Sequence, residues 1–230
     1  PRSHDSRRKI AVTRNRAGMR TLSTITLAIL ISLLVGCSEP DKPSVALYLA
    51  VQRGDLDQLE RHIYWGTDIN VLLPNGQYPL QFAAQKGEII MVKTLLKHGA
   101  DTAAVTADGD SALDLAILNG RTQLAEVLLA QGARLDASAV LLKAAQIGVT
   151  DRDTVRFLTA RGADLEQRNA DGDTPLLIAI RQDNHRLATH LVNRGADVNA
   201  KAADGQSALA LAKELQLPEL ISLLERQGAI

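Results

Sequence analysis

Apolar residues recur along the chain in short segments with helical spacing, separated by polar turns. Val92, Leu95 and Leu96 form one such stripe, and Val127 and Leu128 lie in another. A spacing of three or four residues places apolar side chains on one face of a helix. The pattern therefore predicts a series of short amphipathic helices, including a variant pair over residues 45–53 and 56–64.

Two markers keep a constant period along the same stretch. A glycine followed by a small residue recurs at spacings of 33, 33, 30, 33 and 33, at Gly66, Gly99, Gly132, Gly162, Gly195 and Gly228. An Asx-Gly pair, which supplies the left-handed conformations of a tight turn, stands at 75–76, 108–109, 171–172 and 204–205. Helix N-caps are expected at Ser111, Thr174 and Ser207.

The combined pattern resembles the ankyrin repeat, whose unit is a β-turn finger followed by two antiparallel helices. The resemblance covers about residues 44–230 and implies an all-α solenoid of about six units, including atypical caps. The expected units lie near residues 44–74, 75–107, 108–137, 138–170, 171–203 and 204–230. The family pattern has a loop-tying His after Thr-Pro-Leu. That network is expected to be incomplete here, because the corresponding residues are Gln81, Asp114, Leu177 and Ala210.

The fourth unit departs from the pattern. No Asx-Gly turn stands between Gly132 and Leu141, where five residues are missing, and two residues are added near residues 148–154. One interpretation is drift in a tolerant loop. The other is that the missing finger opens a notch in the row of fingers.

The first 36 residues have the order of a targeting segment. Basic residues up to Arg20 precede an apolar run over residues 22–35, which is shorter than the roughly 20 residues of a membrane-spanning helix. Residues 34–37 (LVGC) resemble the lipobox of bacterial lipoproteins, which implies cleavage after Gly36 and acylation (palmitate) of Cys37, the only cysteine. The alternatives are an uncleaved signal anchor or an incidental cysteine. Because Met19 precedes the run, residues 1–18 are interpreted as an upstream extension.

The lipobox resemblance implies a lipid-anchored protein on the periplasmic side of the bacterial cell envelope. Ser38 after the cysteine favours the outer membrane over the inner one. Residues 37–43 are the expected tether between the lipid and the repeats. The membrane is then contacted through the lipid anchor only, and several acyl chains make such anchoring stable.

Charge and composition narrow the class of partner. The chain has 26 basic and 26 acidic residues, but seven basic and one acidic residue lie in residues 1–36. The remaining 19 basic and 25 acidic residues give the rest of the chain a formal charge of −6. No basic surface for nucleic acid is expected. Apolar residues make up 46% and aromatic residues 3%, which suits packed helices better than a β-sandwich.

No set of residues with catalytic or metal-ligand spacing was found. The histidines after residue 36 are scattered, at His62, His98, His185 and His190. Asp108, Asp110 and Asp114 belong to a turn and a helix start, and their loop has the wrong length for calcium. We therefore expect no enzyme, metal site or cofactor.

The ankyrin resemblance implies a protein partner, bound by a monomer on the concave face that finger tips and first helices form. Leu118 and Ile147 are apolar where solvent-facing residues are expected, so they are candidate anchors, unless they pack on each other. The candidate partner-binding residues are Gln52, Arg53, Gln77, Tyr78, Gln85, Lys86, Asp110, Leu118, Asn119, Gln146, Ile147, Asp173, Arg181 and Gln182.

Three functions fit these expectations. The first is an adaptor or scaffold that binds a protein partner in the periplasm. The second is an immunity or inhibitor protein for a periplasmic toxin or enzyme. The third is a factor that protects an oxidative-stress enzyme.

Overall fold

The structure is a computed structural model that describes residues 39–230. Residues 42–230 form one compact unit, to which the following description applies. Cys37 and the expected signal peptide lie outside the described residues. The helices are α2 (Leu47–Arg53), α3 (Leu56–Tyr64), α4 (Pro79–Lys86), α5 (Ile89–Lys97), α6 (Ala112–Leu118), α7 (Thr122–Ala130), α8 (Ala137–Gln146), α9 (Arg152–Thr159), α10 (Pro175–Arg181), α11 (His185–Val192), α12 (Ala208–Glu214) and α13 (Pro218–Arg226).

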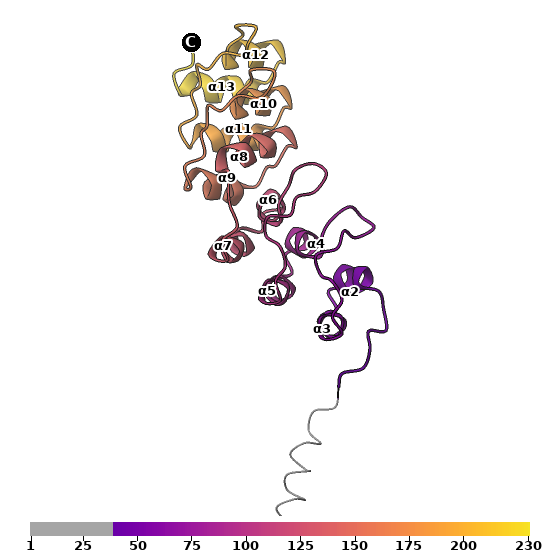
Figure 1. Cartoon of the computed structure of the whole chain (residues 1–230). Helices are drawn as coiled ribbons and strands as arrows, with labels where there is room; N and C mark the ends of the chain where they lie inside the picture. Colours follow the sequence, from indigo (N-terminus) through magenta and orange to yellow (C-terminus); the bar gives the residue numbers. More distant parts are fainter. Residues whose placement is uncertain (1–38) are drawn as a thin grey trace, which may run out of the picture. The chain divides into compact units, whose positions relative to one another are not determined.

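The helices form six pairs that stack along the chain, as the sequence pattern predicted. The even-numbered helix of each pair packs against the even-numbered helix of the next, and the odd-numbered helices from α7 onward do the same. Figure 1 shows the two rows side by side, with the long connecting loops projecting from the even-numbered row. The expected all-α solenoid is therefore confirmed. Within residues 39–230 the backbone forms two isolated β-bridges, Val105–Ser111 and Lys201–Ser207, and no strand.

The expected helix ends are also confirmed. Ser111, Thr174 and Ser207 each accept a hydrogen bond from the backbone N–H three residues later. Gly99 (φ 84°) and Gly132 (φ 85°) adopt the left-handed conformation expected after a helix. These features arise locally, because a cap satisfies backbone groups that the helix itself leaves unpaired.

The core is a continuous layer of leucine and alanine between the two rows. Each first helix contains at least one fully buried alanine, such as Ala84, Ala116, Ala144 and Ala179, which allows neighbouring pairs to approach closely. Leucines of both rows fill the space between the pairs; examples are Leu59, Leu95, Leu113, Leu141, Leu158 and Leu191.

The fourth pair lacks the finger that precedes the others. Six residues (131–136) join α7 to α8, whereas fourteen residues (98–111) join α5 to α6. The connection before α8 is short partly because α8 starts early. It begins seven residues before Ala144, whereas α4 begins only four residues before the equivalent Ala83. The finger predicted to be missing is therefore absent.

Candidate functional site

The candidate residues lie along one row of the solenoid. They occupy the ends of the even-numbered helices and the turns before them, as in α4, which follows Gln77 and Tyr78 and ends at Gln85 and Lys86. We call these turns and helix ends the finger row. Solvent-exposed members of the predicted set are Gln52, Arg53, Lys86, Asn119, Gln146, Ile147, Arg181 and Gln182, whereas Gln77, Tyr78 and Gln85 are half-buried.

The prediction that Leu118 faces solvent is wrong. Its side chain is 9% exposed, because α6 packs against α4, α7 and α8 and is buried on almost every side. Ile147 lies one residue beyond the end of α8 and is 58% exposed. A pair of exposed apolar anchors is therefore excluded, and so is a buried Leu118–Ile147 pair. Ile147 alone remains available to a partner.

A recurring contact links each turn to the helix that follows it. Gln77 Nε2 donates to Gln85 Oε1 at 3.1 Å, and Arg181 Nε donates to Asp173 Oδ2 at 2.7 Å. Gln206 contacts Glu214 in the same way. In all three cases the partners are eight residues apart, so the contact is a property of the repeat.

The third unit breaks this rule. The residue eight positions after Asp110 is Leu118, which has no polar group. Asp110 is instead bound by Lys143 of α8, whose Nζ donates to Asp110 Oδ1 at 2.5 Å and to Asp108 O at 3.2 Å. Lys143 thus connects the turn of unit three directly to the next helix pair, beside the place where the fourth finger is missing.

Asp110 and Asp173 are buried, so the prediction that they form exposed finger tips is wrong. Their carboxylates turn inward because Lys143 and Arg181 bind them. The exposed acids of the turns are those of the Asx-Gly pairs. Asp108 and Asp171 stand two positions before Asp110 and Asp173, and Asp204 is the Asx residue of the last turn. The sequence pattern did contain these residues, but it was interpreted only as a turn signal.

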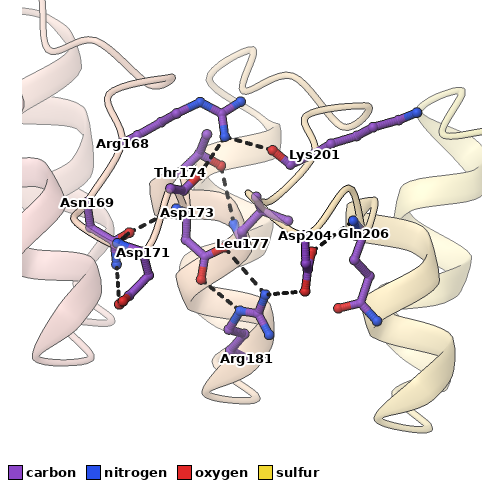
Figure 2. A network of polar contacts seen from close by, with 11 residues as sticks. Arg168, Asn169, Asp171, Asp173, Thr174, Leu177, Arg181, Lys201, Asp204 and Gln206 are labelled. Carbon is purple, nitrogen blue, oxygen red and sulfur yellow. Dashed lines mark hydrogen bonds and ion pairs between the residues drawn. The ribbon is translucent and has the colours of Figure 1, made fainter.

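Figure 2 shows the polar contacts that link the turns of units five and six. Arg181 lies between the two turns, 2.7 Å from Asp173 and 3.9 Å from Asp204. The hydrogen bond that Arg181 donates to Asp173, with the charges of the neighbouring acids, raises the pKa of Arg181 above its ordinary value. Arg168 Nη1 donates to Lys201 O at 2.7 Å and so ties the same turns together.

The loop-tying network is more complete at unit two than the sequence pattern implied. Gln81, which replaces the His of the family pattern, is buried, and its Nε2 donates to Ala104 O at 2.9 Å and to Asp110 O at 3.3 Å. An amide therefore performs the tie between neighbouring loops at this position. At unit five, where Leu177 has no donor, Arg168 supplies the tie.

The missing finger leaves a cavity of about 530 Å³ between the turn of unit three and α8, which we call the notch. Its lining includes Val105, which is 52% exposed, and Ala139. Four carboxylates and two cations surround it: Asp108, Asp110, Asp114, Asp136, Arg134 and Lys143. Asp110 is bound by Lys143, Asp114 by the N–H of Ser111, and Asp136 caps α8. Within residues 39–230 the side chains of Asp108 and Arg134 form no ion pair or hydrogen bond.

Other chemistry is limited in the described part of the chain. No group of three or more His, Cys, Asp or Glu side chains is placed to hold a metal ion between residues 39 and 230. Buried His62 has a structural position, with Nε2 at 2.8 Å from Val45 O and Nδ1 at 3.1 Å from Thr67 Oγ1. None of the described helices has the length and apolar character needed to cross a membrane.

Comparison with known proteins identifies the class. The family model for ankyrin repeats (three copies) matches residues 47–139 and 141–229, and the chain belongs to the ankyrin repeat family. Ankyrin repeats are a protein-binding scaffold, and the stacked pairs and finger row described above have that architecture.

Solved structures with the same fold include bacterial and animal proteins. One is a chain from the structure of a predatory endopeptidase from Bdellovibrio bacteriovorus in complex with an immunity protein, at 28% identity and TM-score 0.65, covering 80% of this chain and 99% of that one. The ankyrin repeat domain of Bcl-3 is 27% identical, with TM-score 0.67 and coverage of 83% and 89%. An ankyrin repeat domain from Acinetobacter baumannii is 28% identical, with TM-score 0.62 and coverage of 80% and 98%. No curated protein sequence matches the chain.

Proposed function

We propose that the protein is a lipid-anchored adaptor of the bacterial envelope that binds a protein partner through its finger row, with the notch at the centre of the binding surface. The observation that carries the proposal is the open notch itself. A finger precedes α4, α6, α10 and α12, whereas side chains of α8 are left uncovered.

The notch has the properties of a recognition site. Its volume lies within the range of about 300–1,000 Å³ that is typical of binding pockets. Val105 offers an apolar contact, and Asp108 and Arg134 offer charges that no described residue neutralises. Ile147 adds an exposed apolar side chain at the end of the same helix. A protruding loop of a partner would fill the place of the missing finger.

Cross-linking in cells tests this proposal. A photo-reactive amino acid at the exposed notch residue Ala139 is expected to capture the partner, whereas one at Lys93 of α5 is not. Inserting the turn sequence of residues 169–173 between Leu135 and Asp136 fills the notch and should abolish capture. The same five residues inserted between Val149 and Thr150 serve as the matched control. Capture that persists when the notch is filled would refute the assignment of the site.

The anchoring part of the proposal rests on the LVGC sequence at residues 34–37. Metabolic labelling with palmitate should mark the wild-type protein, and the Cys37→Ser variant should lose both the label and its place in the membrane fraction. Separation of inner and outer membranes then determines which membrane holds the protein. Membrane association that survives Cys37→Ser would exclude a lipoprotein anchor.

A second candidate function is an immunity or inhibitor protein for a periplasmic enzyme or toxin. The similarity to a chain from the endopeptidase–immunity protein complex, which this chain matches over 99% of that chain, favours it. The two functions differ in outcome. An inhibitor would suppress the activity of its captured partner at a one-to-one ratio, whereas an adaptor would bind without suppressing it.

A further inference from the structure

A cleft between the odd-numbered helices α9 and α11 has a lining rich in hydrogen-bond donors. The cleft has a volume of about 420 Å³ and is lined by Arg152, Val155, Thr189, His190, Asn193 and Arg194. Guanidinium, imidazole, hydroxyl and amide groups can all donate hydrogen bonds, and no carboxylate is among these residues. It lies on the helix row that carries no fingers and is therefore separate from the notch.

The arginines around this cleft lack acidic partners. Among residues 39–230, Arg152, Arg186 and Arg194 form no ion pair or side-chain hydrogen bond, although other arginines of the same row do. Arg156, for example, is 3.0 Å from Asp153. Asp151, the acid whose charge acts on His190, accepts instead from the backbone N–H and hydroxyl of Thr154, at 2.7 and 2.8 Å.

Arginine side chains from two helices surround this cleft. Arg152 begins α9, Arg186 lies four residues before His190 on one face of α11, and Arg194 lies two residues beyond the end of α11. The like charges of these arginines repel each other. Burial lowers the pKa of His190 most, and the charge of Arg152 lowers it further; Asp151 opposes these effects, and Arg186 and Arg194 add smaller decreases. The cleft thus has a positive potential in a part of the chain whose formal charge is −6 from residue 37 onward.

We propose that the cleft binds a phosphate group, with Arg152 and Arg194 as its principal ligands. The planar guanidinium matches pairs of phosphate oxygens, and Thr189 and Asn193 can donate to the remaining ones. A phosphate with close to two negative charges offsets the repulsion among three arginines better than a single carboxylate does.

Titration of the purified protein with inorganic phosphate tests the site. The NMR resonances of the His190 ring should shift on binding, and bound phosphate should raise the pKa of His190, because a nearby anion favours the imidazolium. In the double variant Arg152→Gln/Arg194→Gln, affinity should fall about ten-fold or more. Arg134→Gln, which removes an equally unpaired arginine on the finger row, is the control and should leave affinity unchanged.

A second arm identifies the source of the phosphate. Vesicles of phosphatidylglycerol and of phosphatidylcholine, at equal ionic strength, replace the inorganic ion. Binding of inorganic phosphate that the double variant loses supports a small ligand. Binding only to phosphatidylglycerol, again lost in the double variant, supports a lipid headgroup. Equal binding by wild type and double variant, or no binding of either probe, overturns the proposal. An unchanged thermal transition of the double variant would show that any loss is not a failure to fold.

Discussion

The Lys143–Asp110 ion pair makes a sharp prediction about the stability of the array. Asp110 lies in the turn of unit three and Lys143 in α8, so the pair joins these two units where the fourth finger is absent. The atoms Nζ and Oδ1 are 2.5 Å apart, and the two side chains are 30% and 11% exposed. In Lys143→Met the apolar stem is retained, while the only side-chain donor to this carboxylate in the described part of the chain is lost.

The expected cost follows from this burial. An unsatisfied buried acceptor costs about 1–3 kcal/mol, and a fully buried ion about 3–5 kcal/mol. Because Asp110 keeps slight contact with solvent, we expect the free energy of unfolding to fall by about 2 kcal/mol in Lys143→Met. For a domain of this size about 1 kcal/mol lowers the Tm by about 2–4 °C, so the expected decrease is about 4–8 °C.

Thermal and urea unfolding, followed by circular dichroism, measure this effect. Lys213→Met is the control, because Lys213 and Glu225 are 3.4 Å apart but half-exposed, and an exposed pair is worth at most about 1 kcal/mol. Adding Asp110→Asn to Lys143→Met should recover about 1 kcal/mol, since the buried charge is then removed. A loss below about 0.5 kcal/mol in Lys143→Met, or a double variant no more stable than the single one, would refute the reasoning.

Three further predictions concern the core, the finger row and pH. Leu141 of α8 is fully buried, so Leu141→Ala should lower the free energy of unfolding by about 2–5 kcal/mol in urea titrations, and a loss below 1 kcal/mol would contradict its placement. Ile147→Glu should change that free energy by less than about 0.5 kcal/mol yet weaken capture of the partner in cross-linking, and undiminished capture would remove Ile147 from the site. The fold lowers the pKa of His190 below the value of about 6.5 that it has in the unfolded chain, so the folded state favours the neutral ring. The contribution of His190 to stability should therefore be complete above about pH 6.5 and be lost as the pH falls through that value toward the folded pKa. His190→Gln should abolish this part of the pH dependence of Tm.

The placement of the candidate residues was only partly predictable from the sequence. They do lie at the turns and helix ends of one row, because equivalent positions of a repeat occupy equivalent places in the stack. Which of its side chains reach solvent was not predictable in the same way. Leu118 was expected to be exposed by analogy with its counterparts, but it is buried because α6 packs against α4, α7 and α8. Asp110 was expected at a finger tip, but Lys143, 33 residues later, turns it inward.

The sequence by itself determined the period, the helices, their caps and the absence of the fourth finger. These features depend on interactions within a few residues, such as Ser111 with the N–H of Asp114, or on glycine backbone conformation. Only the tertiary structure decided which charges are paired and where open space remains. The notch, and the approach of Arg152 to Arg194, depend on how neighbouring pairs pack, and that packing joins residues more than 30 positions apart.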